Sequence, residues 1–180
     1  MEITFVTSNP SKAEQLSRHL HIPVVHRKVD VHEIQSLDLR EVAEHKAREA
    51  QKIIGGTVLV EDTSLVFHAL NNLPGPLIKW FLTALDNEGL CKLLNNYNNR
   101  NATATVCFAL CDNESVRFFE AEQQGVIADI PRGDRGFGWD PIFIPDGYEK
   151  TWGEMTTEEQ KETSMRKVAL GKLAEFLTHA

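Results

Sequence analysis

The residues best suited to chemistry are two adjacent carboxylates, Glu61 and Asp62, in the stretch TVLVEDTSLVF. They follow the apolar run Val58 to Val60, which lacks alternation and therefore predicts a strand buried on both faces. If that strand stops at the carboxylates, they stand at the carboxyl edge of the sheet, where open α/β sheets bind ligands. Hard oxygen ligands suit Mg²⁺, and the hydroxyls of Thr63 and Ser64 suit a phosphate. A solvated loop is the alternative interpretation.

A lysine inside an apolar helix stripe is the second candidate. We expect a helix over residues 38–54, with Asp38 as its cap and Glu41 three residues further on. Lys46 lies near the middle of the stripe, where a charge is costly unless it reaches water or meets an anion. Because the helix leads directly into the strand with Asp62, we expect a carboxylate or phosphate partner. The stripe consists of Leu39, Val42, Ala43, Ala47, Ala50 and Ile53.

A polar turn near the start is the third candidate. A short strand over residues 2–7 is followed by Ser8, Asn9 and Pro10, so a helix should begin at about Pro10. The N-terminus of such a helix, which carries Lys12, can bind an anion. The turn lacks the pattern of a Walker A loop, and a simple helix cap is the alternative interpretation.

The other elements must position these residues. Strand and helix patterns alternate, which predicts an α/β protein with a mixed, elongated sheet flanked by helices. A glycine-rich loop with two aromatic residues, over 132–141, is suited to approaching a flat ligand. The expected elements are an edge strand over 22–29, helices over 77–85 and 88–97, a hairpin over 102–127 that turns at Asp112 to Glu114, a strand over 142–144, and a helix over 164–178 that buries Val168, Ala169, Leu173 and Phe176.

Composition narrows the classes of function. The 180 residues include 19 Lys and Arg against 26 Asp and Glu, and the net charge of −7 disfavours a nucleic-acid binder. The start of the sequence shows no signal-peptide pattern, and no apolar run is long enough for a membrane span, so we expect a cytoplasmic protein with no membrane partner. The cysteines Cys91, Cys107 and Cys111 lack the spacing of a zinc site and are expected to be reduced thiols. No linker divides the chain, which predicts one domain over 1–180.

Three segments give a more specific indication, namely TSNPSK, VEDTSLVFHALNNLPGPLIKWFL and GFGWDPIFIPDGYEKTWGEM. With these segments the chain resembles the Ham1-like inosine triphosphate pyrophosphatases over nearly its whole length. The resemblance implies two lobes with a central substrate cleft, a homodimer, and hydrolysis of a purine nucleoside triphosphate to the monophosphate and pyrophosphate. It also implies a requirement for Mg²⁺, with Mn²⁺ as a second candidate.

The resemblance assigns roles residue by residue. It implies that Glu33 and Asp62 hold the metal and that Lys46 lies beside the phosphates, and these three are the expected catalytic residues. Asp62 is the expected group for the attacking water, with Glu61 as its rival. The substrate-binding residues implied by the family motifs are Thr7, Ser8, Asn9, Lys12, Lys46, Asp62, Thr63, Lys79, Phe137, Gly138, Trp139, Asp140, Gln160, Lys161, Ser164, Met165 and Arg166.

Two positions depart from the family pattern. The base-contacting lysine falls on Gln160, with Lys161 one residue further on, and the histidine falls on Met165. Since Met165 cannot donate a hydrogen bond to a 6-keto base, the base preference is open. The leading hypothesis is an enzyme that acts on inosine, deoxyinosine and xanthosine triphosphates. The alternatives are a pyrophosphatase with altered or relaxed base choice and a nucleotide-binding protein with weak turnover.

Overall fold

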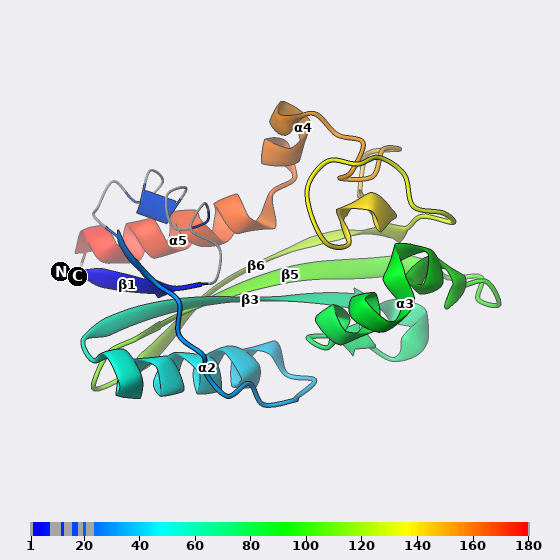
Figure 1. Ribbon diagram of the computed structural model, residues 1–180. Coiled ribbons are helices and arrows are strands. Elements are labelled where there is room, and N and C mark those ends of the chain that lie inside the picture. Colours follow the sequence, from blue (N-terminus) through cyan, green and yellow to red (C-terminus); the bar gives the residue numbers. More distant parts are fainter. Residues whose placement is uncertain (1, 8–11, 13–15, 18–19, 21–23, 180) are drawn as a thin grey trace. The chain divides into compact units, whose positions relative to one another are not determined.

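The computed structural model describes residues 2–7, 12, 16–17, 20 and 24–179, which contain a seven-stranded sheet flanked by helices (Figure 1). The strand order is β2-β1-β3-β5-β6-β7, and β4 pairs with β3. The strands are β1 (Ile3–Val6), β2 (Val24–Arg27), β3 (Thr57–Phe67), β4 (Pro74–Gly75), β5 (Asn101–Cys111), β6 (Val116–Ile127) and β7 (Phe143–Pro145). The helices are α2 (Leu39–Ile54), α3 (Ile78–Lys92), α4 (Thr157–Glu162) and α5 (Met165–His179), and short 3₁₀ turns span His68–Leu70 and Asp140–Ile142.

The sheet is mixed, as the sequence predicts. Strand β1 pairs in parallel with both β2 and β3, whereas β4 and β7 pair antiparallel with β3 and β6. Strand β2 lies at one edge, which confirms that prediction. Between β5 and β6, the Asp112 carboxylate accepts hydrogen bonds from the amides of Glu114 and Ser115 and so closes the turn without a glycine.

Strand β3 corrects one expectation. The strand does not end at Glu61 and Asp62 but continues to Phe67, so both carboxylates lie in its interior. Residues 58–60 are fully buried as predicted, and Leu65 and Phe67 return to the core at 0% exposure. A strand can continue through two charges because each of these carboxylates meets cationic side chains, which removes the need to leave the sheet for water.

The described chain forms two compact units. Unit 1 comprises Met1–Thr63, Val106–Ala121 and Arg166–Ala180, and unit 2 comprises Ser64–Thr105 and Glu122–Met165. Within unit 1, α2 and α5 cover opposite faces of the strands (Figure 1). That residues 1–180 act as one domain stays a prediction.

Helix α2 follows the predicted bounds and packs closely on the strands of unit 1. The Asp38 carboxylate accepts hydrogen bonds from the amides of Arg40 and Glu41 and caps the helix. The Glu41 side chain bonds Ser36 and does not return to the cap. Ile53 is 60% exposed, so its predicted place on the buried stripe is wrong, and Ile54, the last residue of the helix, packs against the core cluster instead. The buried residues are Leu39, Ala43, Ala47 and Ala50, which pack with Val58, Val60 and Cys107.

Two other helices also differ from the predictions. The backbone of Asp86, at φ 54° and ψ −175°, is not helical and divides α3 into two helices, as predicted, but the second of them ends at Lys92 instead of Tyr97. In α5, Val168 is 55% exposed and Leu170 takes a buried position. Ala169 and Leu173 are buried as predicted, so the prediction for this helix is wrong at Val168 and missed Leu170.

The core of unit 2 is rich in aromatic residues. The rings of Trp139, Phe143 and Trp152 lie within 4.5–6.0 Å of one another. The indole N–H of Trp152 donates to the hydroxyl of Thr163, so the one polar atom of this ring is satisfied. The three cysteines form no disulfide, as expected, and all three are buried. None of the described helices combines the length and the apolar character that crossing a bilayer requires.

Candidate functional site

The charged centre of unit 1 is Lys46, which lies between two carboxylates. Its Nζ is 3.1 Å from Oδ2 of Asp62 and 3.5 Å from Oε1 of Glu33. It also donates to the main-chain carbonyl of Glu61 at 3.3 Å. The Lys46 side chain is only 15% exposed and that of Asp62 23%. The expectation that a lysine on this stripe meets a negative partner is confirmed.

Strand alternation explains why Asp62 reaches Lys46. Successive side chains of a strand point to opposite faces, so Asp62 shares its face with Val58 and Val60. Those two valines pack in one cluster with Ala43 and Ala47, which flank Lys46 on α2. Because the alanine side chains are small, the helix can approach the strand closely. The Lys46 side chain then extends along the strand and its ammonium reaches the Asp62 carboxylate.

The charges of this cluster are not balanced. Burial raises the pKa of Asp62 above its ordinary value, and the nearby charges of Glu33 and Glu61 raise it further against the opposing effect of Lys46. Burial acts to lower the pKa of Lys46, but Asp62 and Glu33 together raise it, so the lysine stays charged. The cluster therefore has an excess of carboxylate over cation, which an added cation would relieve.

Glu61 lies on the opposite face of β3 and has other partners. Its carboxylate accepts hydrogen bonds from Nε and Nη2 of Arg166, each at 3.2 Å, and from Nζ of Lys12 at 3.3 Å. The side chain is 5% exposed. The Arg166 guanidinium also lies over the ring of Phe108, 5.7 Å from its centroid.

Glu61 as a link between Lys12 and Arg166 is the feature that the sequence analysis missed. The sequence did contain a signal for it, because adjacent residues of a strand cannot point to the same face. In a loop after the strand this alternation would not apply, and the sequence analysis expected the strand to stop at the carboxylates.

The carboxylates of Glu33 and Asp62 fit a divalent cation in part. Among the residues that the structure describes, no group of three or more His, Cys, Asp or Glu side chains is arranged to hold a metal ion. Mg²⁺ is commonly bound by one or two carboxylates together with substrate phosphates and water. Two carboxylates with excess negative charge suit that mode, and they do not suit a site built from protein ligands alone.

The N-terminal turn is described only in part. Ser8, Asn9 and the expected helix start at Pro10 lie outside the described residues. The Thr7 amide donates to the carbonyl of Arg27, and the Thr7 carbonyl accepts a hydrogen bond from Nε2 of His26. Thr63 follows Asp62 in β3 and is half-buried.

The glycine-rich loop of unit 2 presents the ring of Phe137, which is 71% exposed. The Phe137 amide donates to Oδ2 of Asp140, and a Cβ on Gly136, at φ +76°, would collide with that carboxylate. Burial raises the pKa of Asp140 to about 6. The carbonyl of Gly138 accepts a hydrogen bond from Asn87. The Asp140 carboxylate thus closes the loop from within.

Trp139, expected beside Phe137 in a wall against the base, is 9% exposed and packs into the aromatic core. Lys79 is exposed in the first turn of α3, where its ammonium lies 5.8 Å from the ring centroid of Trp80.

The C-terminal candidates of unit 2 have different environments. Gln160 uses its amide nitrogen to donate to the carbonyl of Trp152 at 2.7 Å, whereas Lys161 is exposed on α4. Met165 packs against the aromatic core, and Ser164 is half-buried. Of these four side chains, only Lys161 presents a charged donor to the surface.

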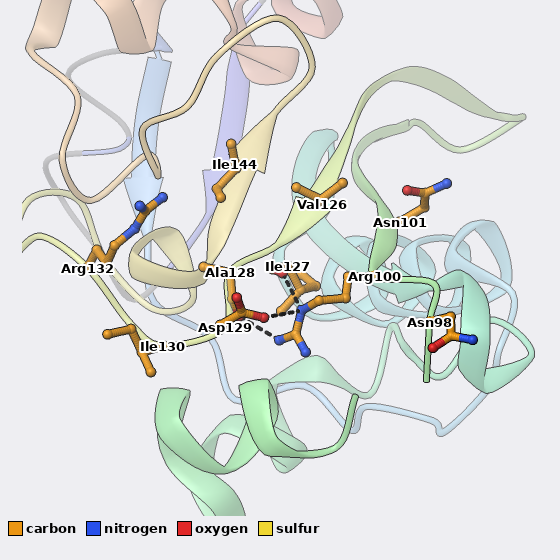
Figure 2. A pocket seen from close by; sticks show the side chains of 10 residues that line it. All are labelled: Asn98, Arg100, Asn101, Val126, Ile127, Ala128, Asp129, Ile130, Arg132 and Ile144. Atoms are coloured by element: carbon orange, nitrogen blue, oxygen red, sulfur yellow. Dashed lines mark hydrogen bonds and ion pairs between the residues drawn. The ribbon is translucent and has the colours of Figure 1, made fainter. Parts of the chain in front are cut away.

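A cavity of about 670 Å³ also lies in unit 2, but it contains none of the predicted site residues (Figure 2). The Arg100 guanidinium at its wall donates to the carbonyls of Cys91, Ile127 and Ala128 and pairs with Asp129. These bonds satisfy main-chain carbonyls at the ends of strands and a helix, so Arg100 has a structural role here. The residues that line the cavity are Asn98, Arg100, Asn101, Val126, Ile127, Ala128, Asp129, Ile130, Arg132 and Ile144.

The mixed sheet and the buried charged cluster define an α/β protein with a polar site on its central strand. Residues 3–176 match the model of the Ham1 family, and the chain belongs to that family. This confirms the resemblance seen in the sequence.

Individual proteins with high similarity to this chain support the same family assignment. The chain is 43% identical to inosine triphosphate pyrophosphatase 2 of Trypanosoma cruzi, over 94% of this chain and 88% of that protein. It is also 43% identical to the inosine triphosphate pyrophosphatase of Emericella nidulans, over 97% and 96%. The solved structure of a nucleoside-triphosphatase / dITP/XTP pyrophosphatase from Mycobacterium abscessus is 32% identical, covers 96% of this chain and 98% of its own, and superposes with a TM-score of 0.82.

Proposed function

We propose that this protein hydrolyses inosine, deoxyinosine and xanthosine triphosphates to the monophosphate and pyrophosphate. It is a hydrolase acting on an acid anhydride. The observation that carries the proposal is 43% identity to two inosine triphosphate pyrophosphatases over nearly the full length. The ion pairs of Lys46 with Asp62 and Glu33 give that similarity a chemical basis.

The proposed cofactor is Mg²⁺, with Mn²⁺ as a substitute. Glu33 and Asp62 would hold it, because both carboxylates converge on one point and carry uncompensated charge. When bound, the ion would neutralise charge on the phosphate oxygens and align them for attack.

The protein's own residues support the same reaction. Lys46 and Lys12 are cations that can exchange a carboxylate partner for a phosphate oxygen of the substrate, which stabilises the charge that develops on attack at phosphorus. Asp62 is the proposed group that orients and deprotonates the attacking water. Glu61 is a poor rival for this role, since its two carboxylate oxygens are engaged by Arg166 and Lys12 and its side chain is 5% exposed.

Residues of the unit 2 loop and α4 are proposed to select the base. Phe137 offers an exposed ring for stacking, and Lys161 offers a donor for a 6-keto oxygen. Gln160 already donates to the Trp152 carbonyl, and Met165 packs in the core, so both support the site less directly. The other proposed substrate contacts are Thr7, Ser8, Asn9, Thr63, Lys79, Gly138, Trp139, Asp140, Ser164 and Arg166.

A pyrophosphatase of altered base choice is the second candidate. The absence of a histidine at Met165 favours it, because one donor at the keto edge of the base is lost. We also propose that the protein is a homodimer in the cytoplasm, and the family resemblance supports the homodimer. The net charge of −7 supports the proposal that it binds no nucleic acid.

A panel of nucleoside triphosphates tests the proposal. Pyrophosphate release would be measured for inosine, xanthosine, guanosine and adenosine triphosphates, with and without Mg²⁺. Release of pyrophosphate from inosine triphosphate only when Mg²⁺ is present is the expected result. Release of orthophosphate alone would overturn the reaction, and a preference for adenosine triphosphate would support altered base choice.

A further inference from the structure

The segment that carries Glu33 has no regular structure of its own. Residues 28–38 connect β2 to α2 and contain neither helix nor strand. Main-chain hydrogen bonds of a helix or sheet therefore do not fix the position of Glu33. Val29 and Val31 anchor the segment to the core, and side-chain contacts with the neighbouring helix contribute to the position of Glu33.

A pair of histidine rings supplies such a contact. His32 and His45 meet edge to face, with their ring centroids 5.9 Å apart and an interplanar angle of 67°. This is the geometry that aromatic pairs favour. His32 belongs to the irregular segment and His45 to α2, so the contact joins these two parts of unit 1.

The ring pair lies directly beside the charged cluster in the sequence. Glu33 follows His32, and Lys46 follows His45. The two chain segments are thus joined by two consecutive contacts: the rings, and the ion pair between Lys46 and Glu33 at 3.5 Å. An ion pair of this length with a carboxylate that is 42% exposed contributes little by itself.

His45 has the environment of a packing residue. Its Nδ1 is buried and has no hydrogen-bond partner among the described residues. A ring that worked through hydrogen bonding would have a partner for this atom. Nδ1 therefore adds no hydrogen bond to the contact, and the observed contact of His45 with His32 is the one between the ring surfaces.

We propose that His32 and His45 are positioning residues that hold Glu33 beside Lys46 for catalysis. The inference rests on the proposed function, because the role of Glu33 at the metal is part of that function. It predicts that the shape of the ring matters at both positions and that its nitrogen atoms do not.

The first experiment tests the contact without any need for turnover. The backbone order parameter of the Glu33 amide would be measured by NMR relaxation in the wild type and in His45→Ala, a change on the helix that leaves residues 28–38 intact. We expect the value to fall from about 0.85, typical of ordered backbone, to below about 0.6. His45→Phe should keep the wild-type value, and Arg48→Ala, an exposed change on the same helix, is the matched control. An unchanged value in His45→Ala overturns the inference, whether or not the protein hydrolyses triphosphates.

The second experiment tests the link to catalysis. In His32→Ala, kcat/KM for inosine triphosphate should fall about two- to tenfold, the range that corresponds to the loss of one aromatic contact. His32→Phe should restore it to within about twofold of the wild type. In a Glu33→Gln background, His32→Ala should cause no further loss, since the ring acts through Glu33. A full additional loss in that background would show that His32 acts by another route and would overturn the inference. A wild type without turnover would instead overturn the proposed function and leave the NMR result to decide the contact.

Discussion

The buried carboxylate of Asp140 should make the stability of the fold depend on pH. Its pKa is raised from the ordinary value of 3.8 to about 6, because burial disfavours the charged form more than the Phe137 amide stabilises it. A carboxyl whose pKa is higher in the folded than in the unfolded state stabilises the fold below pH 3.8, and that contribution is lost as the pH rises through about 6. The shift of about two units corresponds to roughly 3 kcal/mol above pH 7.

Replacing Asp140 by Asn should remove this pH dependence. The amide oxygen still accepts a hydrogen bond from Phe137, but no charge has to be buried. The difference in unfolding free energy, Asp140→Asn minus wild type, should therefore increase by about 2.5 kcal/mol between pH 4 and pH 8. Taking this difference cancels the titration of all other groups.

Urea unfolding, followed by tryptophan fluorescence at several pH values, measures this difference, and Trp139 next to the site makes it a suitable probe. Asp134→Asn, an exposed change in the same loop, is the matched control. A difference that stays constant with pH, or decreases as the pH rises, would refute the argument that Asp140 is buried at a cost.

Three further predictions concern the charged cluster and the base. Asp62→Asn should lower kcat by about 10²–10⁴ while the circular dichroism spectrum is kept, and full activity would contradict its role as general base. Glu61→Gln should raise KM for inosine triphosphate more than it lowers kcat, because Lys12 and Arg166 lose the charge that orients them; an equal loss in kcat would instead favour Glu61 as the base. Lys161→Met should reduce the preference for inosine over adenosine triphosphate about tenfold, whereas Gln160→Ala should mainly lower the melting temperature, and the reverse result would return the base contact to Gln160.

Much of the fold could be predicted because local signals were strong and agreed with the packing. Asp38 caps α2 where expected, because an aspartate carboxylate readily accepts hydrogen bonds from the free amides of the first helical turn. Ala43 and Ala47 lie at 0% exposure because the helical period places them on the buried face. From the same period, the position of Lys46 near the middle of the apolar stripe predicted that it would meet an anion.

Other features could not be predicted, because they depend on contacts between residues far apart in the sequence. The continuation of β3 past Asp62 is one example, since a pair of charges ordinarily marks a strand end, and here Lys46, Arg166 and Lys12 offset these charges. The burial of Trp139 is another, because a glycine-rich loop gives no indication of which ring turns inward. The hydrogen bond from Gln160 to the Trp152 carbonyl likewise has no local signal.

The position of Glu61 and Asp62 as neighbours on one strand separates two tasks that a single carboxylate could not combine. The pleat directs Asp62 toward α2, where Lys46 balances its charge only in part, and directs Glu61 toward Arg166 and Lys12, where its charge is fully engaged. A carboxylate held by two cations is a poor base and a poor metal ligand, but it fixes the cations well. A carboxylate with excess negative charge around it is the better metal ligand and base. One dipeptide in the middle of a strand can therefore organise a cation site on one face of the sheet and hold basic side chains in place on the other.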